Sequence, residues 1–400
     1  MTAILDTLLS LDTETSTRER WLWAGICCLL VSLPALSVTI PPGMDLPQQV
    51  GQIRLFLENV GRPDTIYDIN WLGTNKLSYL LLGLLWLVLP PLHVGRAAML
   101  VLAVLWTAAA HATAAGFRRP VANAVMASFL VFNVSYTCAF LNFVIGWPVF
   151  LLWVTLLSRP EWAKPCVRRQ LAILGLSFLL FYAHIFWFAL ALVWLAAWGL
   201  YTRQPWRAQV SRAACLLPVL LWAGAWSFDY SMRWVGDKYN PAPQWFENVA
   251  LRAFHWFFNE TLVTVWGAAG LLCSGLLAVW FVLMGLVHRR NMFGRAEPAL
   301  GLAAGICILL SLGLPGVWIH TMYLDTRFVA PALILCLLAL PAPLPDTRAL
   351  RLGLCLCLAV FCVFVTQAWR AFEKEDLSGL RETLEALPEN PRVIGLSYII

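Results

Sequence analysis

Long apolar runs separated by short polar turns extend through most of the chain. A helix needs about 20 apolar residues to cross a bilayer, and about eleven runs approach that length. The pattern predicts an all-α polytopic membrane protein with about eleven transmembrane helices. The predicted spans are Trp21–Ile40, Leu77–Leu92, Ala97–Ala115, Val121–Tyr136, Phe143–Leu157, Leu171–Leu200, Ala213–Phe228, Leu262–Val287, Ala299–Ile319, Phe328–Leu344 and Leu352–Trp369.

Composition agrees with this pattern. Hydrophobic residues make up 60% of the chain and charged residues 12%, against about 45–50% and 25% in soluble domains. We expect a cytoplasmic segment at 1–20, a transmembrane domain at 21–369, and the start of an extracytoplasmic segment at 370–400 that holds a short amphipathic helix and a strand in need of a partner. Any chemistry must therefore come from loops at the membrane face and from side chains inside the helix bundle.

Arginines in the short turns orient the predicted spans. Arg203, Arg207, Arg290 and Arg348 mark turns on the cytoplasmic side, because short cytoplasmic loops carry an excess of Lys and Arg. With the N-terminus inside, the two large loops 41–76 and 229–260 face the exterior. Both are predicted to contain interfacial helices.

One stretch conflicts with this orientation. Eleven spans place the Arg118–Arg119 turn and the basic loop 159–169 on the exterior. Either the short run Phe143–Leu157 or the long run Leu171–Leu200 is therefore irregular. The long run would measure about 45 Å as one helix, against a hydrocarbon core of about 30 Å. It could be two half-helices meeting near His184 or one tilted helix.

The first exterior loop places Asp45 directly after the first span. Asp is a favoured N-cap and Pro47 suits a first helical turn, so Asp45 could be only a cap. The alternative is a general base at the membrane face. Asp64 and Asp68 follow in the same loop, where solvation alone would also explain them.

The second exterior loop combines aromatic residues with cations, among them Arg252 and His255. An interfacial aromatic belt would explain the aromatic residues by themselves. Aromatic and cationic side chains at headgroup level would also suit a lipid phosphate.

Ionisable residues near the apolar runs are His184 and Arg327. Such residues are rare in lipid and usually face a cavity or a partner. His184 could be a neutral histidine bonded to a neighbouring helix, and Arg327 could pair with Asp325 or reach a phosphate.

The sequence lacks the features that usually mark several other classes of function. The net charge of +6 is small and no basic segment is interleaved with aromatic residues, so we expect no nucleic acid partner. The eleven cysteines lie mostly in apolar runs and show no zinc spacing, and we predict no metal ligands. P-loop, dinucleotide-binding, zinc-protease and serine-hydrolase motifs are not found.

The layout resembles the GT-C superfamily of membrane glycosyltransferases, which contains the protein O-mannosyltransferases and the lipid A aminoarabinose transferases. The similarity rests on the Met44–Asp45 step after the first span, an interfacial first loop, a second large exterior loop and a terminal exterior segment. Three short segments also resemble stretches of bacterial members: Phe140–Gly146, Phe181–His184 and Tyr323–Phe328.

The resemblance implies a GT-C-like fold in a bacterial inner membrane and transfer of a sugar from polyprenyl phosphate to an acceptor of unknown identity. Asp45 would be the catalytic base, with Asp64 or Asp68 in reserve, and Arg327 or Arg252 would stabilise the leaving phosphate. His184 and His255 would complete the substrate site. The resemblance implies no definite cofactor, and the use of a divalent metal is left as an alternative. Leu46 follows Asp45 at a position where the group commonly has a second acidic residue, which bears on metal use. The rival class is a non-enzymatic transporter or lipid flippase, with His184 and Arg327 lining a pathway.

Overall fold

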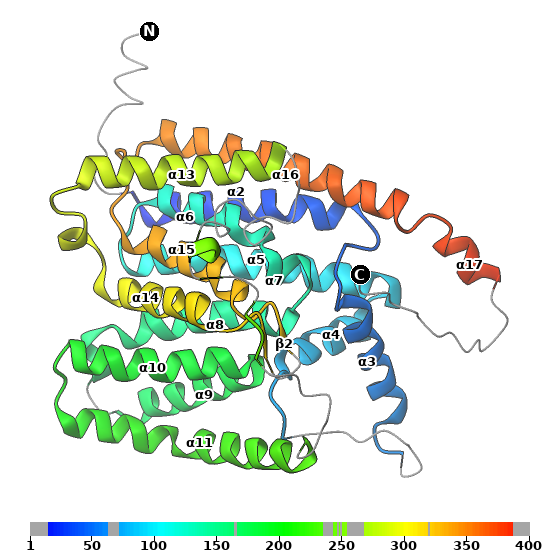
Figure 1. Ribbon diagram of the computed structural model, residues 1–400, viewed down its shortest axis with the longest axis horizontal. Helices are drawn as coiled ribbons and strands as arrows, with labels where there is room; N and C mark the ends of the chain where they lie inside the picture. Colours follow the sequence, from blue (N-terminus) through cyan, green and yellow to red (C-terminus); the bar gives the residue numbers. More distant parts are fainter. Residues whose placement is uncertain are drawn as a thin grey trace, which may run out of the picture.

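The chain forms an all-α bundle (Figure 1). The computed structural model describes residues 15–62, 72–163, 166–234, 243–245, 248, 250–253, 268–318 and 321–386. Within these residues, five helices are long and apolar enough to cross a membrane. They are α2 (Thr17–Ser37), α5 (Pro91–Gly116), α11 (Trp206–Trp234), α13 (Ala268–His288) and α16 (Arg348–Glu375).

Shorter helices complete the bundle. They are α3 (Leu46–Asn59), α4 (Leu77–Val88), α6 (Val121–Ser128), α7 (Val134–Thr137), α8 (Leu141–Leu157), α9 (Val167–Ala183), α10 (Ile185–Tyr201), α14 (Pro298–Gly313), α15 (Val329–Ala339) and α17 (Leu380–Ala386). The described residues also form the 3₁₀ turns η1 (Phe129–Phe132), η2 (Pro160–Ala163), η3 (Phe293–Arg295) and η4 (Thr326–Phe328). The strands β1 (Val317–Trp318) and β2 (Thr321–Met322) form a small antiparallel hairpin.

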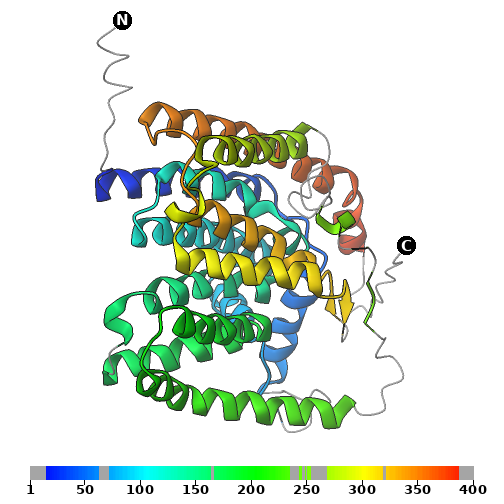
Figure 2. The same ribbon diagram turned by 60° about the vertical axis from the view of Figure 1, so that its left-hand side comes forward.

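Most helices lie side by side, with their axes roughly along one direction (Figures 1 and 2). Tryptophans fill the interior between α5, α8 and α10: the rings of Trp106 and Trp147 lie 5.2 Å apart, and Trp187 packs 5.7 Å from Trp147. A Cβ at Gly146 would stand 2.1 Å from Trp187 Cδ1, so only glycine admits this ring. Close packing of this kind holds apolar helices together where lipid supplies no hydrophobic drive between them.

One end of the bundle gathers arginines, and we name it the arginine end. Arg20 of α2 donates to the Arg119 carbonyl over 2.8 Å, and Arg119 donates to the carbonyls of Leu338 and Ala339 over 2.9 and 2.7 Å. The end of α5 and the end of α15 therefore lie beside the start of α2.

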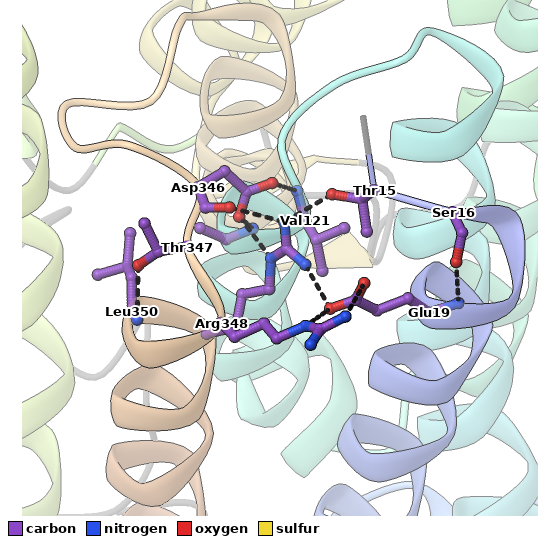
Figure 3. Close-up of polar contacts among 10 residues, drawn as sticks. Thr15, Ser16, Glu19, Val121, Asp346, Thr347, Arg348 and Leu350 are labelled. Atoms are coloured by element: carbon purple, nitrogen blue, oxygen red, sulfur yellow. Dashed lines mark hydrogen bonds and ion pairs between the residues drawn. The ribbon is translucent and has the colours of Figure 1, made fainter. Parts of the chain in front are cut away.

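A clasp at the arginine end joins α2, α6 and α16 (Figure 3). Arg351, which is 2% exposed, donates to Asp346 over 2.8 Å and to Glu19 over 3.0 Å. The Asp346 carboxylate also accepts the backbone N–H groups of Val121 and Ala122 and so caps α6. Each charge in this clasp has an opposite partner, as buried charges require.

The opposite end is named the Asp45 end. The Asp45 backbone N–H donates to the Cys138 carbonyl over 3.1 Å, which docks the start of α3 on the end of α7. Glu373 near the end of α16 accepts the N–H groups of Thr39 and Ile40 over 2.7 and 2.9 Å. The exits of α2 and α16 thus meet at this end.

The run Leu171–Leu200 forms two helices, α9 and α10, that meet at His184. At the Asp45 end, His184 packs against Phe143 of α8. At the arginine end, Gln170 near the start of α9 binds Ser211 in the second turn of α11, the helix that follows α10. The two helices are therefore antiparallel, and the single tilted helix is wrong. Each has 17 residues, about 25 Å, and is more than a half-helix. His184 lies at a helix end and not in the middle of a span.

A second correction concerns Leu77–Leu92, which was expected to cross the membrane. The helix α4 begins at the Asp45 end, where the Lys76 N–H donates to the Tyr182 carbonyl over 2.6 Å. It leads into α5, whose early residue Arg96 reaches the Val38 carbonyl at the same end. Both ends of α4 therefore lie at the Asp45 end, and the helix does not traverse the bundle.

The boundaries of the other predicted spans differ less from the helix boundaries in the structure. Phe143–Leu157 is the regular helix α8, so this run is not the irregular one. α14 ends at Gly313, before the predicted limit of Ile319, because the chain turns into β1. α16 continues to Glu375, beyond Trp369, and the predicted strand at 392–400 lies outside the described residues.

Candidate functional site

Asp45 stands at the N-cap position of α3, with Pro47 in the first turn as the sequence predicts. Its side chain makes no capping hydrogen bond, so capping does not account for the carboxylate. The backbone is fixed from the other side, because Gly43 approaches Ala139 so closely that a Cβ at 43 would stand 2.9 Å from Ala139 Cβ. Gln49 strengthens the contact by donating to the Ala139 carbonyl over 3.0 Å.

The Asp45 carboxyl is half-buried at this junction. Burial raises the pKa of Asp45, and the positive charge of Arg327 partly opposes that rise. A carboxylate with a raised pKa is a stronger base than a solvated one, which suits proton abstraction near neutral pH.

Arg327 is fixed at the start of α15 by two kinds of contact. Its Nε and Nη2 donate to the Met322 carbonyl over 3.2 and 2.8 Å. Its guanidinium carbon lies 3.8 Å from the centre of the Phe140 ring, a cation–π arrangement. The side chain is only 7% exposed. Its planar group is therefore held in one orientation.

Asp45 and Arg327 face the same region without forming an ion pair. Each influences the other electrostatically, yet no carboxylate among the described residues lies within 4.0 Å of the Arg327 nitrogens. Asp325, a predicted partner of Arg327, pairs instead with Arg252 over 3.5 Å. A buried guanidinium that keeps donor capacity beside a separated carboxylate can receive an anion.

His184 borders the same region. Its ring packs on Phe143 at 5.5 Å and on Phe186 at 5.1 Å, and its Nδ1 accepts the Phe186 N–H over 3.2 Å. The side chain is 7% exposed and its positive neighbour is Arg327. The expectation that His184 faces the bundle is confirmed. Its local role is to cap α10.

Three residues around this region adopt the left-handed backbone conformation without being glycine. They are Asn75, Ala139 and Tyr323, with φ of 64°, 56° and 55°. Ala139 precedes Phe140, and Tyr323 precedes the turn that carries Arg327. Such residues cost about 1–3 kcal/mol each and concentrate at functional sites, although asparagine tolerates the conformation better than alanine.

Arg252 lies near the same end in a different setting. Its Nη1 donates to the carbonyls of Leu312 and Leu314 at the end of α14 and pairs with Asp325. These contacts join a short segment of the loop 229–260 to α14 and η4. A substrate role for Arg252 stays a prediction.

Three predicted site residues cannot be placed. Asp64, Asp68 and His255 lie outside the described residues. Among the described residues, no group of three or more His, Cys, Asp and Glu side chains is arranged to hold a metal ion.

Several polar side chains at the site were missed by the sequence analysis. Tyr79 of α4 donates to Gln52 of α3, and Ser78 donates to Asn142 at the start of α8. Lys76, beside them, is half-buried, and burial lowers the pKa of its amine. The signal in the sequence is the polar stretch 74–79, which the predicted boundary at Leu77 divides between the first loop and the following span.

The three short segments that carried the family resemblance meet here. Phe140 lies under Arg327, Phe143 touches His184, and the Phe143 and Phe328 rings lie 5.4 Å apart. Comparison with known proteins adds no family to this geometry: no protein-family model, curated protein or solved structure matches the chain.

Proposed function

We propose that the protein is an integral membrane glycosyltransferase that moves a sugar from a polyprenyl-phosphate donor to an acceptor. The observation that carries the proposal is the fixed, separated pair of Asp45 and Arg327 at one end of an apolar bundle. A lipid phosphate could bind to the guanidinium while its chain lies among the apolar helices. The separated carboxylate is then available to an acceptor.

The proposed reaction assigns one task to each group. The Asp45 carboxylate takes the proton of the acceptor hydroxyl as its oxygen attacks the anomeric carbon. The bond between that carbon and the phosphate oxygen breaks, and polyprenyl phosphate leaves with the electron pair. Arg327 stabilises the charge on the departing phosphate, an effect of about 3–4 kcal/mol for one well-placed donor.

The same proposal includes an orientation in the membrane. If α4 stays at the Asp45 end and α9 and α10 cross separately, eleven crossings remain, and the basic turns at 118–119, 159–169, 203–212, 289–295 and 348–351 all fall on one side. The excess of arginines makes that side cytoplasmic and the Asp45 end exterior. A bacterial inner membrane fits this arrangement, and the conflict over Arg118 and Arg159 disappears.

A binding experiment with purified full-length protein tests the phosphate role. Geranylgeranyl phosphate should raise the unfolding temperature, whereas geranylgeraniol, which lacks the phosphate, should not. Arg327→Lys keeps the charge but loses the planar donor pair, so the shift should fall. Arg54→Lys is the matched control because Arg54 is exposed on α3 and pairs with Glu58.

A transfer assay with polyprenyl phosphates that carry different sugars tests the reaction. Release of polyprenyl phosphate in wild type, and its loss in Asp45→Asn, is the expected result. Binding that does not depend on the phosphate, or lipid movement across vesicles that survives in Asp45→Asn, would favour the transporter or flippase.

A further inference from the structure

The turns after α8 and α10 are strongly basic. Between residues 158 and 212 the sequence has seven Arg and Lys residues and one acidic residue, Glu161. The basic residues are Arg159, Lys164, Arg168, Arg169, Arg203, Arg207 and Arg212. The helical residues 171–201 between the two turns contain no Asp, Glu, Lys or Arg, so the charge is confined to one end of the helices.

Specific hydrogen bonds hold these two turns together. Arg212, which is buried, donates to the Trp162 carbonyl over 2.8 Å and to Gln204 over 2.6 Å. Gln170 at the start of α9 donates to Ser211 over 2.8 Å. The start of α9 and the turn between α10 and α11 therefore form one surface, which we name the basic turn surface.

Exposed arginines and exposed apolar side chains adjoin on the basic turn surface. Arg168, Arg203 and Arg207 are exposed, and the Arg207 guanidinium lies 5.9 Å from the ring centre of Trp206. Large apolar side chains project within one helical turn of them: Val167, Leu171, Leu200, Tyr201 and Trp206, each more than 60% exposed. Cations, an aromatic ring and aliphatic groups at one level match the boundary between lipid headgroups and acyl chains.

The other half of the arginine end differs in its balance of charge. There Glu19 and Asp346 neutralise Arg348 and Arg351 within the clasp (Figure 3). The sequence of the two basic turns has one acidic residue, Glu161, against seven basic ones.

We propose that the basic turn surface binds the headgroups of anionic phospholipids such as phosphatidylglycerol or cardiolipin. Charge complementarity selects the negative headgroup, because basic clusters at helix ends attract anionic lipids. The adjoining apolar residues favour a phospholipid over a free anion, since they would contact the acyl chains. This inference concerns the arginine end and is independent of sugar transfer.

Thermal unfolding of the purified full-length protein tests the proposal. Cardiolipin should raise the unfolding temperature by about 3 °C or more, whereas phosphatidylcholine at the same concentration should not. Inorganic phosphate should also have no effect. The double variant Arg203→Gln/Arg207→Gln should lose at least half of the cardiolipin shift.

Two matched variants locate the effect. Arg289→Gln/Arg290→Gln removes two exposed arginines from another turn at the same end and should keep the full shift. Arg203→Lys/Arg207→Lys keeps the charge and should keep most of it. Equal loss in the 203/207 and 289/290 glutamine variants would overturn the site in favour of diffuse surface charge, as would an equal shift with phosphatidylcholine. If the variant Arg203→Gln/Arg207→Gln does not fold without added lipid, binding of the wild-type protein to vesicles tests the proposal instead. Binding to phosphatidylglycerol vesicles and not to phosphatidylcholine vesicles would support it, and equal binding to both would overturn it.

Discussion

Buried arginines stand at both ends of the bundle, and two of them, Arg351 and Arg327, have different kinds of partner. Arg351 at the arginine end donates hydrogen bonds to Glu19, Asp346 and Thr15. Within the described residues, Arg327 at the Asp45 end donates to the Met322 carbonyl and lies on Phe140. The Asp45 carboxylate influences Arg327 electrostatically without forming an ion pair with it. Burial alone therefore does not distinguish an arginine with carboxylate partners from one that binds a carbonyl and an aromatic ring.

The difference lies in what happens when a partner is removed. Removing one partner of a buried ion pair lowers the stability of the protein, because the other charge stays buried without compensation. A charge held apart by the backbone costs stability already in the native protein and is retained where binding or catalysis needs it. Substitutions at the two ends should therefore separate stability from activity.

The largest expected effect is at the clasp. Arg351→Leu leaves Glu19 and Asp346 without their shared cation and should lower the free energy of unfolding by about 3–5 kcal/mol. Arg348→Leu is the control, because Arg348 binds the same Glu19 from an exposed position and should cost about 0–1 kcal/mol. Chemical unfolding in detergent measures both. Similar losses in the two variants would contradict the assignment of the clasp to Arg351.

The second effect is on turnover at the opposite end. Asp45→Asn keeps size but removes basicity, so transfer should fall by about a hundredfold or more with no loss of unfolding temperature. Because the Asp45 side chain makes no capping bond, Asp45→Ala should be no less stable than Asp45→Asn. Full transfer activity in Asp45→Asn, with a donor that wild type uses, would remove Asp45 from the mechanism.

A pH effect on stability should accompany the raised pKa of Asp45. Because burial raises that pKa in the folded protein above its ordinary value of 3.8, the protonated form is favoured by folding. The contribution is present below pH 3.8 and is lost as the pH rises through the folded pKa. Asp45→Asn should therefore match wild type in acid and gain unfolding temperature relative to wild type as the pH rises. A constant difference across the pH range would speak against a raised pKa.

The smallest effect is at His184. Its Nδ1 caps α10, so His184→Leu should cost about 1 kcal/mol of stability, while His184→Asn should recover most of that loss. Val193→Ala, at an exposed position of the same helix, should change stability less. Thermal unfolding ranks the three variants. Transfer activity lost in His184→Asn at full stability would show that the imidazole also acts in the reaction.

The apolar runs predicted the helices well because apolar length is a local property. One error arose because the chain turns between α9 and α10 with only one residue, His184, between the two helices. The other arose because the length of an apolar run does not show that α4 begins and ends at the same end of the bundle. In the orientation proposed above, the two errors compensate in the number of crossings, which is why the arginines at 118–119 and 159–169 signalled a conflict in the sequence.

The site was predictable only in part for the same reason. Asp45, His184 and Arg327 stood out because ionisable groups are conspicuous in apolar surroundings. The stacking of Arg327 on Phe140 joins residues 187 positions apart and leaves no local pattern. The ion pair between Arg252 and Asp325 could not be predicted from the sequence either. Asp325 lies two positions from Arg327, which makes Arg327 the more obvious partner in the sequence.

The one-residue junction between α9 and α10 has a consequence for biogenesis. No loop at His184 is long enough to separate the two helices during synthesis, and residues 171–201 contain no Asp, Glu, Lys or Arg. An α9–α10 hairpin can therefore enter the bilayer as one unit, with a neutral tip that crosses at low cost. Arg168 and Arg169 in the first turn of α9, and Arg203 and Arg207 after α10, would hold both of its ends on the side from which it was inserted.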